Sequence, residues 1–311
     1  MGLSLRLRAA LRWLLRKSGG AARRADRTLG RAEASLAVPA LLQREQRRRI
    51  RSAMLAHDMV DDPDERYYRD RYRAWIETQL ERHSVDRSGT FLDAGCGPGR
   101  LTLPLARLIR PHGGQVVGVD MLPESIEAAR GHAASASLTN VDFAQGDLLE
   151  FLLDQSSESF AGALFVEVGY QVFDLPRHVE QLRRILRPGG LLLASFRTQY
   201  YLALLGVMQR DWQLAKTVLR SRSGQLQALG WQNWHSARDA VALLEEGGFG
   251  EVEVGGLGLC SGIAGDPLAA VARPSTMGAA DLDGLAFVET ELAASHPDIG
   301  RYLLASAVRT P

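Results

Sequence analysis

The sequence predicts an α/β protein with a doubly wound, mostly parallel β-sheet covered by helices on both faces. Three observations support this prediction. Short apolar runs alternate with helical segments between Thr90 and Phe196, a turn with glycine at alternate positions follows the first run, and acidic residues end the first three runs. Strands that are connected by helices lie parallel, so their carboxyl ends meet at one edge of the sheet. We expect a ligand site at that edge.

The predicted elements follow one another in a regular order. An acidic first turn and aromatic residues at helical spacing predict a helix over 61–83. The hydrophobic period and the turn residues then predict strands separated by helices. The strands are expected at 90–95, 115–120, 141–147, 161–168 and 191–196, and the helices at 100–109, 123–133 and 177–190.

Two insertions, about 199–235 and 259–300, interrupt the alternation after the fifth strand. The first begins with a helical segment over 200–220 and continues with an aromatic-rich stretch. We expect both insertions to cap the carboxyl edge of the sheet, where their apolar side chains suit a small apolar molecule. Core packing between the added helices explains the same side chains equally well. The remaining elements are a helix capped by Ser236 and ended by Gly247-Gly248, and strands at 251–259 and 301–309.

Charge is distributed unevenly along the chain. The 311 residues include 37 basic and 36 acidic side chains, a formal net charge of +1. Residues 1–51 hold 14 basic and 3 acidic residues, whereas the other 260 residues hold 23 and 33. We therefore expect a basic, helical and partly disordered arm over 1–54 and a separate domain over 55–311.

The arm has two basic segments with helical spacing, 3–17 and 41–55. Such segments suit contact between residues 1–51 and an anionic surface, such as lipid head groups, RNA or an acidic partner protein. A solvated arm without a partner is the alternative.

Composition argues against several classes of protein. No uncharged apolar run approaches the roughly 18 residues that span a bilayer. Two cysteines cannot form a disulfide framework or a zinc cluster, so neither secretion nor a metal site is predicted. We expect a cytoplasmic protein, with the arm as a route to peripheral membrane association. The acidic body does not favour a groove for nucleic acid.

The most informative segment is FLDAGCGPGR, residues 91–100. Its glycines permit positive φ angles and a close approach of the backbone to a ligand, at the start of a helix. Arg100 stands where a dinucleotide fingerprint has its third glycine, which argues against a pyrophosphate loop. Asp120 ends the second strand, where it can accept from ribose hydroxyls, and Asp147 follows the third, where it can accept from an exocyclic amino group. These residues together predict a nucleoside site without a phosphate clamp.

The blocks DAGCGPG, VVGVD, AQGDLLEF and SFAGALFVEVGYQVFDLPRHVEQLRRILRPGG resemble the class I, seven-stranded S-adenosylmethionine-dependent methyltransferases. The resemblance covers about 73–254 and the final strand, and it implies a seven-stranded sheet whose last strand is antiparallel. It also implies S-adenosylmethionine as the cofactor. Ala161 and Gln171 depart from the family, which commonly has aspartate and histidine at these places. The residues that would bind the cofactor are Asp93, Gly95, Cys96, Gly97, Gly99, Asp120, Met121, Asp147, Leu148 and Phe165.

Candidates for contact with the methyl acceptor lie near the ends of the strands. A base is needed only when the acceptor must lose a proton, because the sulfonium is already a strong electrophile. Glu167 directly follows the fourth strand and His235 precedes a helix, and we predict these two as catalytic residues. Tyr170 and His178 are further candidates, and for His178 a position on the solvated surface is the alternative.

The resemblance implies transfer of a methyl group, and the apolar residues of the first insertion lead us to expect a small, largely apolar metabolite of specialised or lipid-related metabolism as the acceptor. Two alternatives remain open. One is an RNA methyltransferase anchored by the basic arm, and the other is a non-catalytic partner protein that binds S-adenosylmethionine. A nicotinamide-dependent oxidoreductase is disfavoured by Arg100.

Overall fold

The computed structural model describes residues 42–226 and 229–311. The chain separates into two units, Met1–Ser52 and Ala53–Pro311. In the first unit the described residues, 42–52, are helical, as predicted for the second basic segment. Glu45 and Arg49 form an ion pair there, one helical turn apart, at 2.9 Å. The first basic segment, 3–17, lies outside the described residues.

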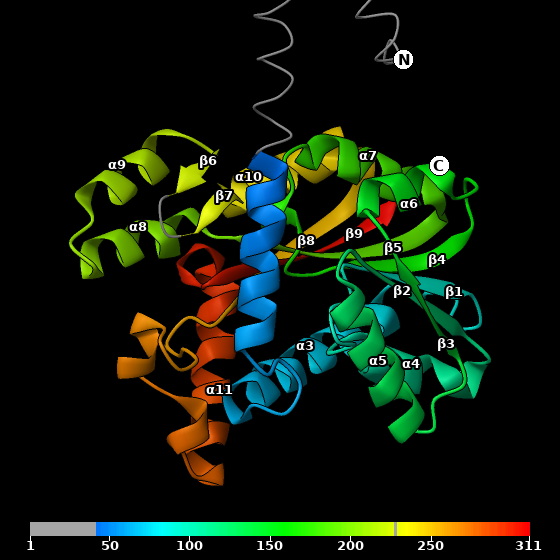
Figure 1. The fold of residues 1–311 in the computed structure, drawn as a ribbon, viewed down its shortest axis with the longest axis horizontal. Helices are drawn as coiled ribbons and strands as arrows, with labels where there is room; N and C mark the ends of the chain where they lie inside the picture. The colour runs from blue at the N-terminus through cyan, green and yellow to red at the C-terminus, as the bar shows by residue number, and fades with distance from the viewer. Residues whose placement is uncertain (1–41, 227–228) are drawn as a thin grey trace, which may run out of the picture. The chain divides into compact units, whose positions relative to one another are not determined.

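The second unit is built on a seven-stranded sheet in the order β3-β2-β1-β4-β5-β9-β8 (Figure 1). Six strands run parallel and β9 runs antiparallel to its neighbours β5 and β8, which confirms the predicted fold class. The strands are β1 (Thr90–Ala94), β2 (Gln115–Asp120), β3 (Val141–Gln145), β4 (Phe160–Phe165), β5 (Leu186–Arg197), β8 (Phe249–Leu257) and β9 (Tyr302–Arg309).

Helices cover both faces of the sheet, which makes the second unit a three-layer structure (Figure 1). On one face, α3 and α4 pack on a core that includes Tyr72, Leu105 and Leu193, and α5 lies against β2 and β3. On the other face, α6, α7 and α10 pack on a core that includes Leu182 and Phe196. The helices are α3 (Pro63–Arg82), α4 (Thr102–Ile109), α5 (Pro123–Ser135), α6 (Leu148–Asp154), α7 (Leu175–Ile185) and α10 (Ala237–Glu246).

Side-chain caps explain where two of the predicted helices begin. The Asp62 side chain accepts from the backbone N–H groups of Asp64 and Glu65 at the start of α3. Ser236 and Asp239 form a reciprocal capping box at the start of α10. Both caps satisfy N–H groups that have no partner within their own helix.

Some elements differ from the prediction. Helix α7 ends at Ile185 instead of Gly190, because the residue before Pro188 favours an extended backbone and β5 already begins at Leu186. The helical segment expected over 200–220 is two helices, α8 (Gln199–Met208) and α9 (Trp212–Arg220), separated where the Asp211 side chain caps α9. Four elements were not predicted: α6, the hairpin of β6 (Ser223–Leu226) and β7 (Gly230–Asn233), and α11 (Ala279–Ser295).

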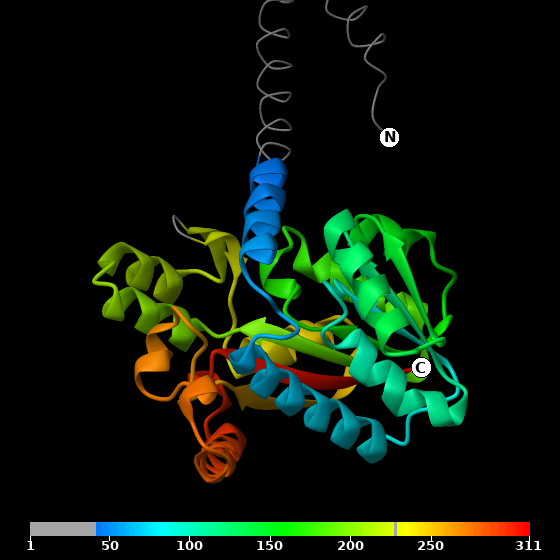
Figure 2. The same cartoon turned by 60° about the horizontal axis from the view of Figure 1, so that its bottom comes forward.

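The two insertions share a small core of their own. Trp234 is fully buried among residues of α8 and α9, and Leu268 of the second insertion joins the same cluster. The Tyr201 hydroxyl donates to Asp266 at 2.6 Å, which links the two insertions directly. Both views show α8, α9 and the orange segment before α11 beside the same end of the sheet (Figures 1 and 2). Their aromatic residues therefore serve partly as core, although Trp212 is 57% exposed.

The second insertion is also fixed to α3. The buried Asp64 carboxylate accepts from the Arg273 side chain at 2.8 Å and from the Ser275 backbone N–H at 2.7 Å. The hydroxyls of Tyr68 and Ser261 lie 2.7 Å apart. None of the helices within 42–226 and 229–311 is both long and apolar enough to cross a bilayer.

Candidate functional site

The turn between β1 and α4 has the backbone conformation that its glycines predict. Gly95, Gly97 and Gly99 have φ angles of +82°, +52° and +91°, in the region that residues with a Cβ rarely adopt. The Gly95 N–H donates to the Val119 carbonyl at 2.8 Å, which holds the turn against β2. A Cβ on Gly95 would lie only 2.2 Å from Val168 Cγ2, so the segment after β4 packs closely over this turn.

Asp120 closes the turn from the end of β2. One carboxylate oxygen accepts from the Gly97 N–H at 3.0 Å and the other from the Leu122 N–H at 2.9 Å. Burial raises the pKa of Asp120, and these N–H donors oppose the shift. Each oxygen retains acceptor capacity, which two neighbouring hydroxyl groups could use. The glycine turn and Asp120, which the sequence places on neighbouring strands, are thus joined by a hydrogen bond in the structure.

The other two predicted aspartates have different surroundings. Asp93 is buried at the end of β1 and accepts from the Thr102 hydroxyl at 2.6 Å, so it supports the turn from inside. Burial, assisted by Asp120, raises the pKa of Asp93 to about 6. Asp147 caps α6 by accepting from the Leu149 and Glu150 N–H groups. Both positions are at the carboxyl edge of the sheet, as predicted.

The remaining residues predicted for the cofactor divide between the core and the edge of the sheet. Phe165 is fully buried and stacks on the His178 ring, with 6.3 Å between centroids. Cys96 is buried within the turn, and burial raises the pKa of its thiol, which makes it a poor nucleophile. Met121 and Leu148 are partly exposed directly after Asp120 and Asp147.

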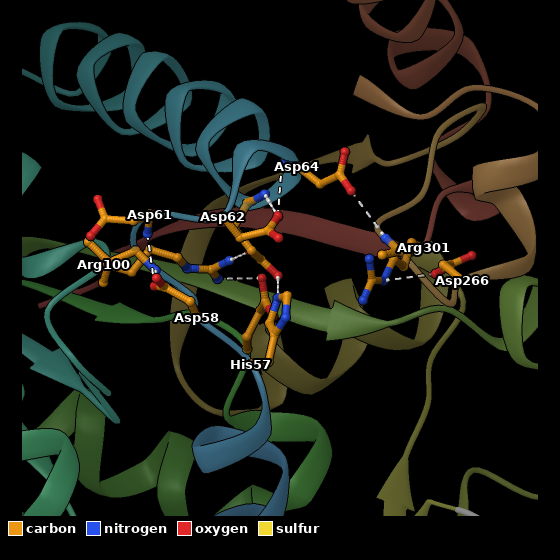
Figure 3. A network of polar contacts seen from close by, with 12 residues as sticks. His57, Asp58, Asp61, Asp62, Asp64, Arg100, Asp266 and Arg301 are labelled. Carbon is orange, nitrogen blue, oxygen red and sulfur yellow. Dashed lines mark hydrogen bonds and ion pairs between the residues drawn. The ribbon is translucent and has the colours of Figure 1, made fainter. Parts of the chain in front are cut away.

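A buried polar network connects the turn to α3 and to the end of β4. Figure 3 shows Arg100 and His57 of this network close to the start of α3. The Arg100 guanidinium donates to Glu65 at 2.5 Å and to Glu167 at 2.6 Å. His57 Nε2 lies 3.0 Å from the second oxygen of Glu65. The hydroxyls of Tyr72 and Tyr302 donate to the two oxygens of Glu167, at 2.9 and 3.0 Å. Glu167 is predicted from the sequence, whereas its hydrogen-bond partners are not.

The Glu167 carboxylate is held as an anion. Burial opposes its ionisation, but Arg100 and Arg301 outweigh burial and lower the pKa of Glu167 to about 2. Its backbone has a φ of +59°, unusual for a residue with a Cβ, and its N–H donates to the Ser195 hydroxyl at 2.7 Å. Such strain at the edge of a sheet is typical of a functional position. A carboxylate of this acidity is a weak base at neutral pH.

The structure does not bring His235 together with Glu167. The His235 ring lies 5.2 Å from the Phe196 ring, and Phe196 belongs to the core under α7 and α10. Ser195, which binds Glu167, faces the opposite layer because side chains alternate along β5. Burial lowers the pKa of His235 to about 4, so its imidazole is neutral at physiological pH. His178 is buried, which corrects the alternative that placed it on the solvated surface.

One signal in the sequence could have identified part of the network. Glu65 lies on the same helical stripe as the buried residues Tyr68, Tyr72 and Ile76, so a carboxylate stands on an apolar face of α3. Burial of a carboxylate requires a positively charged or hydrogen-bonded partner. The identity of that partner, Arg100, depends on tertiary structure.

A small cavity lies beside this network. It has a volume of about 10 Å³, near the lower limit for a single water molecule. A methyl acceptor would therefore need more space than this cavity provides. Its lining residues are Glu65, Tyr68, Arg100, Glu167, Leu257, Gly258, Arg301 and Tyr302.

A protein-family model described as a methyltransferase domain matches residues 86–240, about half of the chain. The chain belongs to the class I S-adenosylmethionine-dependent methyltransferases. It is similar to the ubiquinone biosynthesis O-methyltransferase of Methylobacterium nodulans, with 38% identity over 106 residues, 34% of this chain and 40% of that protein. The enzyme of the same name from Cereibacter sphaeroides strain ATCC 17025 is 38% identical over 105 residues, which are again 34% of this chain and 40% of that protein. The chain thus spans about 40% of the length of these curated relatives.

Two solved structures are also similar to this methyltransferase. The [4+2]-cyclase SpnF has a TM-score of 0.49 and 19% identity, covering 76% of this chain and 81% of that one. An S-adenosylmethionine-dependent methyltransferase from Mesorhizobium loti has a TM-score of 0.45 and 19% identity. The match covers 75% of this chain and 96% of that one.

The cofactor of this methyltransferase is S-adenosylmethionine, and the turn fits it. Where a Cβ would stand on Gly97, Met54 Cε at 3.4 Å is the single atom of the described residues within 4 Å. The backbone can therefore approach a ligand closely at this position. Asp120, bonded to the Gly97 N–H, has oxygens available beside the turn.

Proposed function

We propose that this methyltransferase transfers a methyl group to a small, largely apolar metabolite at the carboxyl edge of its sheet. The hydrogen bond from the Gly97 N–H to Asp120 supports this proposal most directly. It joins the open glycine turn to the carboxylate that we propose as the partner of the ribose. Bound S-adenosylmethionine supplies an electrophilic methyl group, so the chain has mainly to align the acceptor and exclude water.

The cofactor site that we propose uses the residues predicted from the sequence. Asp120 would accept from the ribose hydroxyls, Met121 and Leu148 would flank the adenine, and Asp147 would accept from its amino group. Gly95, Cys96, Gly97 and Gly99 would present the backbone to the methionine part. Asp93 and Phe165 would support these groups from the buried side.

We propose that Glu167 is a positioning residue. Its acidity argues against proton removal from an acceptor, and its two oxygens are bonded to Arg100, Tyr72 and Tyr302. It therefore holds the end of β4 against the glycine turn. The contact between the His235 and Phe196 rings favours a structural role for His235 on the other face of the sheet.

The acceptor is proposed to lie between the sheet edge and the two insertions. Trp231 of the first insertion stacks on Phe173, with 5.3 Å between the ring centroids. Such a pair of aromatic rings suits contact with an apolar molecule. Since the matched relatives are named O-methyltransferases, we propose oxygen as the acceptor atom.

Binding of S-adenosylhomocysteine by Asp120→Ala tests the cofactor site. Calorimetry should show at least tenfold weaker binding than in the wild type, because the ribose loses two charge-assisted hydrogen bonds. Asp142→Ala is the matched control, since Asp142 is an exposed carboxylate on the neighbouring strand β3. Equal affinities in the two variants would contradict the proposed site. Binding without turnover on any acceptor would favour the non-catalytic alternative.

The basic arm is proposed to act separately from catalysis, by contact with an anionic surface. Deletion of residues 1–51 should leave the affinity for S-adenosylhomocysteine unchanged. If the chain is an RNA methyltransferase, the full chain will bind RNA with a steep salt dependence that the deletion abolishes. Absence of RNA binding by the full chain would remove that alternative.

A further inference from the structure

Arg197 is a charged residue without a charged partner at the acceptor side of the sheet. It is the last residue of β5 and lies opposite Tyr302 of β9. Among the described residues, no carboxylate lies within 4 Å of its guanidinium and no side-chain hydrogen bond is made by it. Its Nε is buried without a partner, although the residue as a whole is partly exposed.

Three aromatic rings surround this guanidinium. Its central carbon lies 4.5 Å from the ring centroid of Tyr302, 4.8 Å from that of Tyr170 and 5.5 Å from that of Tyr201. Contacts with ring faces stabilise the positive charge but do not use the N–H donors. The planar fork of Arg197 is thus held in place with its hydrogen-bonding capacity free.

The neighbouring arginines lie beside carboxylates, whereas Arg197 does not, although the Arg301 Nε also lacks a hydrogen bond. Arg100 is bonded to Glu65 and Glu167. Arg301 lies 3.6 Å from Asp266. The Tyr201 and Tyr302 hydroxyls donate to Asp266 and Glu167, so these carboxylates are fixed on their own partners. A buried guanidinium nitrogen without an acceptor is costly unless a ligand satisfies it.

The position of Arg197 relates it to the acceptor instead of the cofactor. Arg197 ends β5, whereas the glycine turn and Asp120 belong to β1 and β2, and β4 separates β5 from them in the sheet. Tyr170 and Tyr201 come from the segments after β4 and β5, where the first insertion begins. The cage is therefore built by the elements that we assign to the acceptor.

We propose that Arg197 binds a carboxylate group of the methyl acceptor, so that the substrate is a largely apolar carboxylic acid. This inference rests on the proposed function. A carboxylate can accept two parallel hydrogen bonds from the guanidinium fork, while the aromatic rings contact the apolar part next to it. Arg197 is thereby a specificity-determining residue, and an acceptor without an anionic group leaves the guanidinium without a charged partner.

Paired ligands test the proposal in the presence of saturating S-adenosylhomocysteine. Calorimetry would compare hydroxybenzoates and medium-chain fatty acids with their primary amides, which keep the shape but lack the charge. The wild type should bind at least one acid at least tenfold more tightly than its amide. Arg197→Met should abolish this preference, and Arg197→Lys should retain part of it because the charge remains. Arg238→Met, a change of an exposed arginine on α10, should bind as the wild type does.

Several results would overturn the proposal. These are equal binding of acids and amides, no binding of any acid at millimolar concentration, and an unchanged preference in Arg197→Met. A loss of affinity for S-adenosylhomocysteine itself in Arg197→Met would mean that the residue binds the cofactor's carboxylate. Circular dichroism and thermal unfolding must show that the variants fold. If the wild type does not bind S-adenosylhomocysteine, the proposed function itself is contradicted. This result distinguishes failure of the proposed function from failure of the Arg197 proposal alone.

Discussion

Arg100 and Glu167 form an ion pair that joins the glycine turn to the end of β4, with 2.6 Å between nitrogen and oxygen. The same guanidinium reaches Glu65 of α3 at 2.5 Å, and all three side chains are at most 16% exposed. One planar donor group therefore fixes the glycine turn, α3 and the end of β4 to one another beside the proposed cofactor site.

Replacement of Arg100 by methionine should destabilise the fold strongly. Arg100→Met leaves Glu65 and Glu167 buried without their cation, and we expect the free energy of unfolding to fall by about 3–5 kcal/mol. Arg100→Lys should recover little of the lost stability, because an ammonium group cannot donate to both carboxylates as the planar guanidinium does. Urea denaturation measures both effects. Arg107→Met, at an exposed position on α4, is the control and should change stability by less than about 0.5 kcal/mol.

A methyl group on Gly95 should also be costly. Gly95→Ala combines a φ of +82° with a contact of 2.2 Å to Val168 Cγ2, so we expect a loss of about 2 kcal/mol or more. Adding Val168→Ala should restore the part that comes from the clash. Gly131→Ala in α5 has no atom within 4 Å of its new Cβ and should instead stabilise by about 0.5–1 kcal/mol. Equal effects at the two glycines would refute the described geometry of the turn.

Asp93 should make stability fall with rising pH. Burial raises its pKa to about 6 in the folded chain, against about 4 when unfolded. The contribution of the Asp93 carboxyl group to the free energy of unfolding is fully present below pH 4 and is lost as pH rises through 6. Asp93→Asn removes this contribution. The stability of the wild type relative to the variant should fall by about 2–3 kcal/mol between pH 4 and 7 in urea denaturation. A difference in stability between the wild type and Asp93→Asn that does not change with pH would contradict this prediction.

His235 should have the opposite effect. Burial lowers its pKa to about 4, against about 6.5 when unfolded, so its contribution is present above pH 6.5 and is lost as pH falls toward 4. The stability of the wild type relative to His235→Gln should therefore rise by about 3 kcal/mol between pH 4 and 7. The two residues partly cancel in the wild type, and the single variants separate them. If the difference in stability between the wild type and His235→Gln does not change with pH, the imidazole is not shielded from water.

The sheet and the glycine turn could be predicted because their signals are local. The Gly95–Gly99 turn, the acid at Asp120 and the cap at Ser236 each depend on residues that lie within a few positions of one another. The number of strands and the antiparallel direction of the last strand followed from the family resemblance. Helix α11 was missed because its Ala- and Gly-containing sequence has little amphipathic pattern, and β6 and β7 because they lack clear alternation.

The polar partners at the site could not be predicted, because the residues are distant in sequence. Arg100 meets Glu65 and Glu167 across 35 and 67 positions, and Tyr302 reaches Glu167 across 135. Each pairing depends on how α3, β4 and β9 come together in the folded sheet. The cage around Arg197 likewise needs β5 and β9 in register.

The position of β9 between β5 and β8 has a consequence for the order in which the chain can fold during synthesis. Strand β8 has β9 as its partner in the sheet, so it has no place there until Tyr302–Arg309 has been made. A nascent chain that stops before residue 302 therefore exposes the edge of β5 and a separate strand β8, and both invite pairing with other chains. The same late strand supplies Tyr302, one of the donors to Glu167. The side of the sheet that we propose for the acceptor is thus completed only after β9 has been synthesised.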